Sequence, residues 1–543
     1  MTPPTFLTLR QLLSGRLAPH PWTDKAHRPT LTARSDCPSA NEERTVPDTD
    51  TAHALGASRT LWELVERRAR LTPDRPALLQ DDRRLTFGAL CDRAERTAAG
   101  LAAMGVRPGS VVAWQLPTRV ETVVLSVALA RLGAVQSPVI PFYREREVGF
   151  ALRESRAGFF AVPGTWRGFD HTALAHRLGA RGVFEAYDGL PDADPATLPP
   201  PPASGTDVRW IYWTSGTTSD PKGVLHTDRS LIAGGACLAH ALRLTPGDVG
   251  SIAFPFAHIG GLDYLVMLLL YGFPAVLFET FALPEALETY RAHGVTTAGG
   301  STAFYAMFLA EQRKQPGEKL VPTLRLLAGG GAPKPPELYH AVVREMGCRL
   351  THGYGMTEVP MITMGSPDDT DENLAGTEGR PPEGMEIRVV DGEVRLRGEA
   401  VCRGYLDPAQ TAGAFDEDGF LRTGDLGYLT DSGHLVLTGR VKDVIIRKGE
   451  NISAKEVEDL LHRHPAVRDA AVIGLPDPER GERVCAVVEA TAALTLGNVT
   501  AFLRDEGLAV HKLPERLEVV DALPRNDTLR KVLKYKLRER YSA

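Results

Sequence analysis

The chain has 543 residues, which is too long for one ordinary domain and predicts a large layered unit with at least one smaller unit. Apolar residues make up 43% and charged residues 24%, as in ordinary globular proteins, and the net charge of −6 argues against a nucleic-acid partner. Six scattered cysteines form no CxxC pair, so neither a zinc site nor a disulfide framework is expected, and a cytoplasmic protein with free thiols fits best.

The first part of the chain has a composition typical of a poorly folding segment. Residues 1–56 are rich in Pro, Thr, Ser, Asp and Arg and lack sustained periodicity, so we expect a poorly ordered extension. The opening two dozen residues have no continuous apolar core, and no signal peptide is expected. The ordered fold should begin near Thr60, where Leu61, Leu64 and Val65 fall at helical spacing.

From about residue 80 to 330, short apolar runs alternate with longer helical stretches. Strands are predicted at 111–113 and 275–278, and helices at Glu121–Leu132 and Pro284–His293. This alternation is typical of an α/β architecture with parallel sheets. The most apolar stretch, Leu262–Phe278, is interrupted by Asp263, Gly272 and Pro274, which favours a buried helix running into a strand over a membrane span.

The predicted elements become shorter after residue 385. A small β-rich subdomain is expected, with strands at Met385–Val390, Glu393–Leu396 and His434–Leu437 joined by Asp/Gly turns. After Gly439 the pattern changes again, which predicts a separate α+β lid of roughly 100 residues. Its expected elements are a helix near Ser453–His462, a strand near Ala470–Gly474 and a helix near Asn498–Asp505.

The strongest local signal is the hydroxyl- and glycine-rich run Thr214–Gly223, which follows an apolar run, Trp210–Trp213. Such hydroxyls and glycine amides suit a loop that folds around anionic oxygens, and Lys222 adds a positive charge. The spacing is not that of a Walker loop, because the lysine is not followed by Ser or Thr. From residue types alone, a flexible polar surface loop is an equal alternative.

This run resembles the phosphate-binding signature of the adenylate-forming (ANL) superfamily, which includes acyl-CoA synthetases, peptide-synthetase adenylation domains and beetle luciferase. Five further motifs match in the same order: Gly329–Pro333, Gly353–Glu358, Arg422–Asp425, Gly439–Asp443 and Lys448–Ile452. The resemblance covers roughly residues 60–543. Chance agreement of so many ordered motifs is negligible.

The resemblance implies an α/β fold in two domains. Residues 57–438 would form the large N-terminal AMP-binding domain, made of two α/β sheet subdomains and a small β-barrel-like subdomain. Residues 439–543 would form a small, mobile α+β C-terminal lid domain. The division agrees with the change of pattern after Gly439.

The resemblance also implies a nucleotide site. The phosphates would be held by Thr214, Ser215, Gly216, Thr217, Thr218 and Lys222. The adenine slot would be formed by Gly329, Gly330, Gly331, Tyr354 and Gly355. Glycines let the base approach the backbone, and a tyrosine ring can stack on it. A tight turn and a core tyrosine are the competing interpretation of the same residues.

Four further residues complete this implied site. Thr357 would hydrogen-bond the phosphate, and Glu358 would hold Mg²⁺, which prefers hard carboxylate oxygens beside phosphates. Asp425 would accept hydrogen bonds from both ribose hydroxyls, since one carboxylate offers two acceptor oxygens, and Arg440 would assist it. Without the resemblance, Thr357 and Glu358 would be interpreted as surface residues and Asp425 as a turn residue.

The resemblance places coenzyme A against the C-terminal domain. Lys442 falls at the hinge about which the family's C-terminal domain rotates between adenylation and thioester formation. Gly449 falls where the family lines the pantetheine tunnel, and its missing side chain would leave room for the CoA arm. Arg447 and Lys448 are candidates for the CoA phosphates, with a solvated basic turn as the alternative.

The segment Phe254–Leu262 resembles the acyl-CoA synthetase form of the acyl-pocket motif. It has Ile259 where activators of aryl acids tend to have Asn, and no Asp in the Asp-Ala-x-x-Trp style of amino-acid activators. His258 would gate the pocket or contact the carboxylate, unless it is a hydrogen-bonded core histidine. Little side-chain volume favours a bulky, mostly apolar carboxylic acid. The expected pocket residues are His258, Ile259, Gly260, Gly261, Gly299, Gly300 and Met356.

The family's last motif, Pro-x-(Thr/Asn)-x-(Thr/Ser)-Gly-Lys, is altered here in the stretch Pro524–Lys534. Aligned from the left, Leu529 replaces the glycine and Arg530 replaces the lysine. Aligned from the right, Lys531 matches, but the loop is one residue longer and lacks its glycine. Arginine does not replace a compact ammonium, and one extra residue moves the tip by a few ångströms, at roughly 3.3–3.6 Å per residue. An impaired adenylation half-reaction is therefore expected.

The sequence predicts an AMP-forming acyl-CoA ligase, an acid–thiol ligase using ATP/AMP, Mg²⁺ and coenzyme A. Its expected catalytic residues are Lys531, Thr357, His258 and Lys222. Four alternatives stay open: a complete ligase, a thioester-forming ligase fed with acyl-AMP by a separate adenylating enzyme, a carrier-protein loader, and a non-catalytic nucleotide binder. The intact phosphate, Mg²⁺, ribose and CoA motifs argue against the last. Pairing into a homodimer is also left open.

Overall fold

The computed structural model describes residues 48–214, 221–448, 450–525 and 532–542. Helix α2 (Asp48–Gly56) lies inside the predicted N-terminal extension, where Ala52 and Leu55 are buried in contact with helix α9 (Ile259–Tyr271). The packed part of the chain therefore starts before residue 57. Residues 1–47 lie outside the described part.

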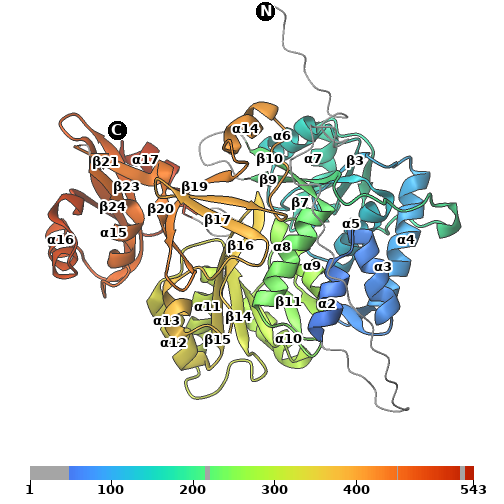
Figure 1. The fold of residues 1–543 in the computed structure, drawn as a ribbon, viewed down its shortest axis with the longest axis horizontal. Coiled ribbons are helices and arrows are strands. Elements are labelled where there is room, and N and C mark those ends of the chain that lie inside the picture. Colours follow the sequence, from blue (N-terminus) through green and yellow to red (C-terminus); the bar gives the residue numbers. More distant parts are fainter. Residues whose placement is uncertain (1–47, 215–220, 449, 526–531, 543) are drawn as a thin grey trace, which may run out of the picture.

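The first α/β unit contains a six-stranded sheet in the order β10-β9-β4-β3-β5-β8, parallel except for the antiparallel pair β9–β10 (Figure 1). The strands are β3 (Val111–Trp114), β4 (Val135–Pro138), β5 (Phe159–Val162), β8 (Val183–Glu185), β9 (Val208–Thr214) and β10 (Lys222–Thr227). A two-stranded ribbon, β6 (Thr165–Trp166) and β7 (Phe169–Asp170), precedes helix α7 (His171–Arg177). The parallel sheet confirms the α/β prediction for this region.

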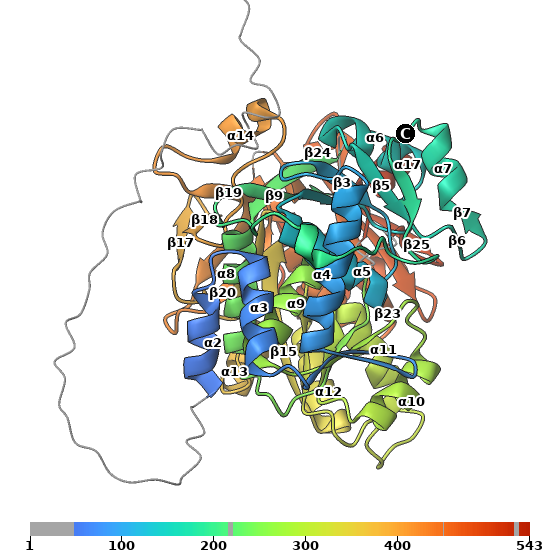
Figure 2. The same cartoon turned by 90° about the vertical axis from the view of Figure 1, so that its right-hand side faces the viewer.

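Helices cover this unit on both sides. Helix α3 begins after the N-cap Thr60, as predicted, and lies beside α4 (Figure 2). The predicted helix at 121–132 is α5, one residue longer. The helices are α3 (Leu61–Leu71), α4 (Phe87–Ala103), α5 (Val120–Leu132), α6 (Glu145–Ser155) and the short 3₁₀ turn η1 (Pro195–Thr197).

The second α/β unit contains two four-stranded sheets, whose edge strands β11 and β13 contact each other. One sheet runs β11 (Gly250–Ile252), β12 (Ala275–Leu277), β1 (Pro76–Gln80), β2 (Arg83–Thr86). The other runs β13 (Thr297–Gly300), β14 (Leu326–Gly330), β15 (Arg349–Met356), β16 (Val359–Met364). A common apolar cluster joins this sheet to helices α10 (Leu283–His293), α11 (Thr302–Gln312), α12 (Pro336–Met346) and α13 (Asp371–Gly376).

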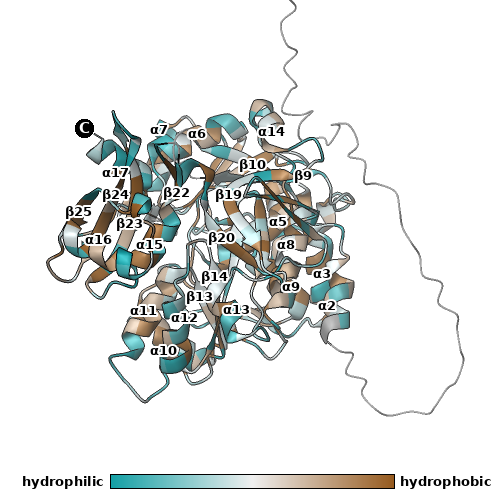
Figure 3. Cartoon of the chain, turned by 60° about the vertical axis from the view of Figure 1, so that its left-hand side comes forward, coloured by the Kyte–Doolittle hydropathy of each residue, from teal (hydrophilic) through white to brown (hydrophobic). Residues whose placement is uncertain are grey.

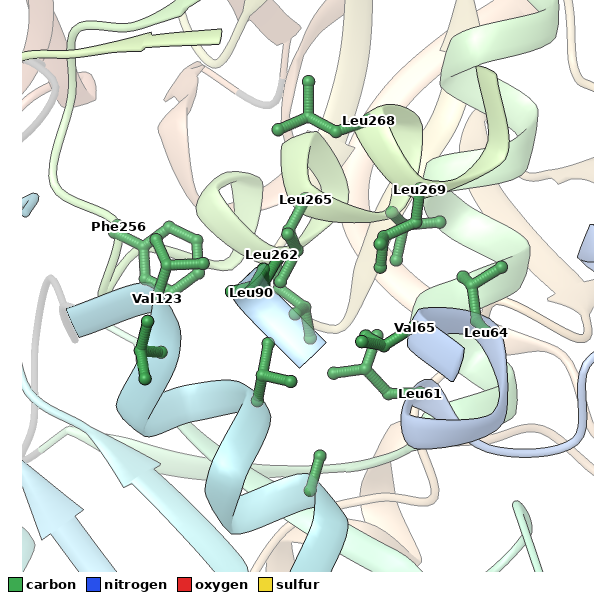
Figure 4. Close-up of a cluster of buried hydrophobic side chains, with 14 of the residues drawn as sticks. Leu61, Leu64, Val65, Leu90, Val123, Phe256, Leu262, Leu265, Leu268 and Leu269 are labelled. Carbon is green, nitrogen blue, oxygen red and sulfur yellow. The ribbon is translucent and has the colours of Figure 1, made fainter. Parts of the chain in front are cut away.

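Helix α9 lies in the main core and packs along helix α8 (Asp228–Ala241). Most of its residues are buried, which explains why its sequence is apolar on every side. Figure 4 shows its leucines against side chains from α3, α4 and α5, among them Leu61, Leu64, Val65, Leu90 and Val123. The predicted buried helix followed by a strand is confirmed as α9 and β12. No helix among the described residues is long and apolar enough to cross a membrane.

The small β subdomain is an antiparallel sheet in the order β17-β18-β19-β20. Its strands are β17 (Met385–Val390), β18 (Glu393–Gly398), β19 (Leu421–Leu429) and β20 (Leu435–Arg440), with helix α14 (Pro408–Ala414) between β18 and β19. The three predicted strands are confirmed. Since β17 and β20 are the two ends of the order, this subdomain is an open sheet rather than a closed barrel.

The C-terminal domain has its own core. Strands β23 (Val467–Asp477) and β24 (Gly481–Ala490) are apolar on both faces, as their colour in Figure 3 indicates, because helices pack on each side. One face meets α15 (Ala454–Leu461) and α16 (Leu496–Asp505), and the other meets α17 (Lys534–Tyr541). The sheet is completed by β21 (Val444–Arg447), β22 (Glu450–Ser453) and β25 (Arg516–Val520), with turns η2 (Val441–Asp443) and η3 (Val510–Lys512) nearby. The α+β prediction is confirmed.

Candidate functional site

Two adjoining cavities lie where the subdomains meet. The larger, of about 990 Å³, lies between the N-terminal domain and the C-terminal domain. The smaller, of about 230 Å³, extends between α9, β13, β14 and β16. Both are lined by Phe254, Phe304, Gly331, Gly353 and Gly355, so these residues mark the junction.

A hydrogen-bond network built on the buried Tyr354 and Asp425 faces the larger cavity. The Tyr354 hydroxyl on β15 donates to Asp425 Oδ2 on β19, and Arg440 Nε on β20 lies 2.8 Å from Asp425 Oδ1. Burial raises the pKa of Tyr354 well above its ordinary value, and the adjacent Asp425 carboxylate raises it further, so the hydroxyl stays a donor. Each carboxylate oxygen has a second lone-pair direction and can still accept from a ligand. The structure therefore brings three predicted nucleotide residues together.

The glycine triplet at the end of β14 lies at the wall between the cavities. A Cβ atom on Gly329 would lie 2.3 Å from the Gly300 carbonyl oxygen, and one on Gly330 would lie 2.3 Å from the Gly353 carbonyl oxygen. Neighbouring strands thus leave no space for side chains here. Gly331, with φ of +82°, lines both cavities, whereas Gly329 and Gly330 line only the smaller one. The adenine slot assigned to this triplet stays a prediction, and Gly331 is its member that reaches the larger cavity.

The ends of the predicted phosphate loop are held together across the sheet. Thr214 ends β9 and pairs with Lys222, which begins β10 and donates its backbone N–H to Thr214 Oγ1 at 3.3 Å. Ser215, Gly216, Thr217 and Thr218 lie outside the described residues. Lys222 Nζ lies 5.0 Å from the centre of the Tyr405 ring, and Tyr405 donates its hydroxyl proton to Glu358 Oε1 at 2.8 Å. The base of the loop and the predicted metal carboxylate therefore share one aromatic neighbour.

The surroundings of Glu358 fit a magnesium ion that is carried by a nucleotide. Glu358 is 7% exposed, and among the described residues only Tyr405 hydrogen-bonds its carboxylate, through one oxygen, so the other oxygen is available to a metal. In the described residues, no group of three or more His, Cys, Asp or Glu side chains could hold a metal by itself. Mg²⁺ at phosphate sites typically uses only one or two carboxylates together with the phosphates. A single glutamate is therefore sufficient.

Thr357 is positioned through its backbone. Its carbonyl oxygen lies 2.8 Å from His226 Nε2, which must carry the proton because a carbonyl can only accept. Burial lowers the pKa of His226 to about 4, so the ring is neutral, and Nδ1 lies 2.9 Å from Ser230 Oγ. Thr357 lines the smaller cavity. Sequence analysis did not identify His226 or Tyr405, since their partners are 131 and 47 residues away.

Most of the predicted acyl-pocket residues line the smaller cavity: His258, Ile259, Gly260, Gly299, Gly300 and Met356. His258 caps α9 and accepts a hydrogen bond from the Gly260 backbone N–H at 3.2 Å. Gly261, the remaining predicted residue, does not line this cavity. A Cβ atom on it would lie 2.3 Å from the Phe256 carbonyl oxygen, so this glycine allows close packing within a turn.

The wall of the smaller cavity is mainly apolar, but it contains one carboxyl group. Apolar side chains come from several elements, including Ile140, Leu238, Met267, Met361 and Met364. Asp263 on α9 also lines the cavity and is 2% exposed. Sequence analysis found no aspartate in the style of amino-acid activators, and this one occupies a different position. Because Asp263 stands within an apolar run of the sequence, no local pattern indicated a functional role for it.

The predicted hinge and CoA residues lie in different surroundings. Lys442, in the turn η2, lines the larger cavity. Arg447 forms a two-bond ion pair with Glu515, at 2.6 and 3.0 Å, and the Lys448 backbone N–H donates to the Arg480 carbonyl oxygen at 2.8 Å. Neither Arg447 nor Lys448 belongs to the described lining of the two cavities. Gly449 lies outside the described residues.

The C-terminal domain presents the flanks of the altered loop to the larger cavity. Arg525 and Val532 both line it and form a β-bridge with each other. The Leu533 backbone N–H also donates to the Pro524 carbonyl oxygen at 2.7 Å, so the two flanks are fixed side by side. The predicted catalytic residue Lys531 and residues 526–530 lie outside the described part of the chain.

The sequence matches known protein families over most of its length. Residues 65–406 match the model for the AMP-binding enzyme family, and residues 456–529 match the model for the AMP-binding enzyme C-terminal domain. The chain is 31% identical to a medium-chain fatty-acid–CoA ligase of Escherichia coli, covering 89% of this chain and 91% of that protein. It is 32% identical to a salicyl-AMP ligase/salicyl-S-ArCP synthetase of Mycobacterium tuberculosis, covering 86% and 88%.

A solved structure has the same architecture. The o-succinylbenzoate CoA synthetase of Bacillus subtilis, in complex with its acyl-adenylate intermediate, superposes with a TM-score of 0.78 at 30% identity. The superposition covers 88% of this chain and 98% of that chain. The chain is therefore an enzyme of the AMP-binding family, in the adenylate-forming (ANL) superfamily to which acyl-CoA ligases belong.

Proposed function

We propose that this enzyme is an AMP-forming acyl-CoA ligase that converts a bulky, mostly apolar carboxylic acid into a CoA thioester through an acyl-adenylate. The observation that carries the proposal is the pair of adjoining cavities. One contains the network of Asp425, Tyr354 and Arg440, and the other has a mainly apolar wall. A mixed anhydride of an acid and AMP has these two halves, and its reacting centre would lie at the junction formed by Gly331, Gly353 and Gly355.

Each half of the adenylate has assigned residues. Asp425 would accept from the ribose hydroxyls while its ion pair with Arg440 fixes its orientation, and Tyr354 with Gly331 and Gly355 would bound the adenine. Thr357 and the loop between Thr214 and Lys222 would hold the phosphates. Glu358 would hold Mg²⁺, which when bound would offset phosphate charge.

The acid would be enclosed by the smaller cavity. His258 at the start of α9 and Met356 at the end of β15 lie on its wall with Gly260, Gly299 and Gly300. The methionine-rich lining suits an apolar body of irregular shape. Relatives that act on fatty and aromatic acids are consistent with a pocket that varies within one scaffold.

Thioester formation would require the C-terminal domain to rotate about Lys442. The cavity now faces Arg525 and Val532, whereas Arg447 and Lys448 lie elsewhere on the domain. A rotation would exchange these faces and bring the segment Arg447–Gly449 to the junction, where Gly449 would leave room for the CoA arm. Arg447 would then have to give up its pairing with Glu515 to reach a CoA phosphate.

The adenylation half-reaction is proposed to be the weaker one. The loop between Arg525 and Val532 is closed at its base by a β-bridge, so an additional residue must be accommodated within the loop. A misplacement of about 1 Å can reduce a rate by roughly 100-fold. An acyl-AMP supplied by a separate adenylating enzyme would bypass this step.

The test is a panel of carboxylic acids scored separately for pyrophosphate release and for CoA thioester. In parallel, synthetic acyl-AMP plus CoA is compared with acid plus ATP plus CoA. We expect thioester to form faster from acyl-AMP. Equal rates from both would refute the impaired adenylation, and no thioester from any acid or acyl-AMP would refute the ligase itself. Transfer to an acyl carrier protein but not to CoA would instead identify a carrier-protein loader.

A further inference from the structure

The smaller cavity contains a polar group that the proposed reaction does not use. Of the described residues that line this cavity, Asp263 alone carries a carboxyl group. It is the fifth residue of α9, beyond the first turn, so it does not cap the free backbone N–H groups of the helix. Its position therefore has no explanation in the helix itself.

The Asp263 carboxyl group is buried without a complete set of hydrogen bonds. Its Oδ1 atom has no hydrogen-bond partner among the described residues. Burial raises the pKa of the group well above its ordinary value, which favours the uncharged acid with one O–H donor and free acceptor positions. Buried polar groups in native proteins are normally paired, and an exception requires a cause.

Cys237 on α8 and Tyr212 on β9 lie close enough to interact electrostatically with the carboxyl group, but neither forms a hydrogen bond with it among the described residues. Gly234 on α8 faces it so closely that a Cβ atom there would lie 3.3 Å from Asp263 Oδ1, and Gly235 packs against the Asp263 backbone. Other lining residues nearby on α8 and α9, such as Leu238 and Met267, are apolar. Since Asp263 also lines the smaller cavity, a bound acid could supply the hydrogen-bond partner that these helices do not.

We infer that Asp263 is a specificity-determining residue that recognises a hydroxyl or carbonyl oxygen on the apolar body of the acid. The inference rests on the proposed function, because it assigns the smaller cavity to the acid. Asp263 lines only that cavity and not the nucleotide cavity, so it would contact the body of the acid rather than the adenylate. The substrate class is then an apolar acid with one oxygen substituent remote from its carboxylate.

A neutral oxygen substituent fits this site better than an ammonium group. An ammonium would need Asp263 to ionise, and both charges would lose their hydration inside a mainly apolar wall. A hydroxyl or carbonyl exchanges one hydrogen bond with the neutral acid and leaves no buried charge. An unsubstituted acid would leave the carboxyl group unpaired, which sites of this kind discriminate against.

The experiment compares three acids that share one skeleton: 3-phenylpropanoic acid and its 4-hydroxy and 4-aminomethyl ring derivatives, together with the 3-substituted isomers. Their non-hydrolysable acyl-sulfamoyl adenosine mimics are titrated calorimetrically against the full-length enzyme, and the acids are assayed for thioester formation. We expect the best hydroxyl mimic to bind roughly tenfold or more tightly than the unsubstituted one, with the difference in turnover appearing in KM rather than kcat.

Three variants separate recognition from packing. Asp263→Leu should reduce the hydroxyl-to-unsubstituted ratio to about one, whereas Asp263→Asn, which still donates and accepts, should keep part of it. Met267→Leu changes an apolar side chain one turn further along the same helix, and it should affect both ligands by a similar factor. If Asp263→Leu does not fold, the inference is tested by Asp263→Asn and by the wild-type ratio of the affinities for the hydroxyl and unsubstituted mimics.

Equal binding of the hydroxyl and unsubstituted mimics at every ring position would overturn the inference and leave the proposed function standing. A parallel loss for both ligands in Asp263→Leu would make Asp263 a structural residue only. Preference for the ammonium derivative would show that the carboxyl group acts as an anion. If no mimic binds and no thioester forms, the proposed function itself fails.

Discussion

At the scale of single residues, the Asp425 carboxylate is held by two protein partners and would also accept hydrogen bonds from a ligand. Arg440 lies 2.8 Å from one oxygen and Tyr354 donates to the other, so the group is fixed before any ligand arrives. Its partners come from β15 of the second α/β unit and from β20 of the small β subdomain. A preorganised acceptor loses little freedom when ribose hydroxyls bind.

Replacing Asp425 by Ala should weaken the binding of ATP and of acyl-AMP by about 1.5–3 kcal/mol, because hydrogen bonds to a charged group are lost. Calorimetric titration with a non-hydrolysable acyl-AMP mimic measures this change. Asp418→Ala, an exposed change in the same subdomain, is the control and should leave the affinity unaltered. An affinity of Asp425→Ala within about twofold of the wild type would contradict the ribose assignment.

The buried His226 predicts a pH dependence with a defined sign. Its pKa is about 4 in the folded protein against 6.5 as its ordinary value, so between these values only the unfolded chain binds the proton. The wild type therefore loses stability as the pH falls from 6.5 to 4, by about 1.4 kcal/mol per pH unit from this group.

His226→Gln should be less stable than the wild type at pH 7.5, because the bond to the Thr357 carbonyl is disturbed. That deficit should shrink by about 2 kcal/mol between pH 6.5 and 5, since the variant has no such proton to bind. Urea unfolding at pH 7.5, 6.5 and 5 provides the measurement, with the exposed His511→Gln as control. A deficit that is constant with pH would show that His226 is protonated in the folded state.

At the scale of elements, α9 contributes both to the core and to the wall of the smaller cavity. Its leucines pack against α3, α4 and α5 (Figure 4). His258 caps the helix, and Asp263 and Met267 lie on the wall of the smaller cavity. Packing of the leucine side therefore fixes where the polar group of the cavity lies. A substitution on the leucine side of α9 should therefore also shift the residues that α9 contributes to the cavity wall.

Leu265→Ala should reduce the free energy of unfolding by about 2–5 kcal/mol, because it leaves a cavity beside a residue that is 1% exposed. Leu71→Ala, at the exposed end of α3, should change it by less than about 0.5 kcal/mol. Urea titration followed by tryptophan fluorescence gives both values. A cost for Leu265→Ala as small as that of the surface control would mean that this part of the core relaxes to fill the space.

Local patterns predicted elements better than they predicted neighbours. The strand Met385–Val390 and the helix at 121–132 follow from short-range periodicity and turn residues, and both are confirmed. The Tyr405–Glu358 and His226–Thr357 contacts depend on how distant strands align, which no local pattern contains. Gly261 was expected in the acyl pocket because it lies in the motif, but the position of the adjacent Phe256 backbone decides its role.

At the scale of the whole molecule, one face of the C-terminal domain borders the larger cavity. Helix α15 and strand β23 line it beside Arg525 and Val532, opposite the Asp425 network. The same domain carries Arg447 on a different hairpin. In the proposed reaction, the two faces act in turn, so a defect in one need not harm the other.

Shortening the altered loop should therefore improve only the first half-reaction. A variant that lacks Leu529 and has Gly in place of Arg530, before Lys531, should release pyrophosphate from acid and ATP at least about tenfold faster, as the lysine moves closer to the reacting anions. Its rate with acyl-AMP and CoA should stay the same. A variant in which both rates are unchanged would show that the longer loop already delivers its lysine.

The glycine wall between the two cavities has a consequence for redesign. Gly329 and Gly330 have strand carbonyl oxygens 2.3 Å from where a Cβ atom would lie, so mutation cannot move this partition without opening the sheet that, in the proposed reaction, would also support the nucleotide. The opposite wall, with Leu238, Asp263 and Met267 on α8 and α9, consists of side chains that can be exchanged one at a time. A mutant library intended to make the enzyme accept a different acid should therefore vary only residues of those two helices. Substitutions there should change the acid that is accepted and leave nucleotide binding unaltered.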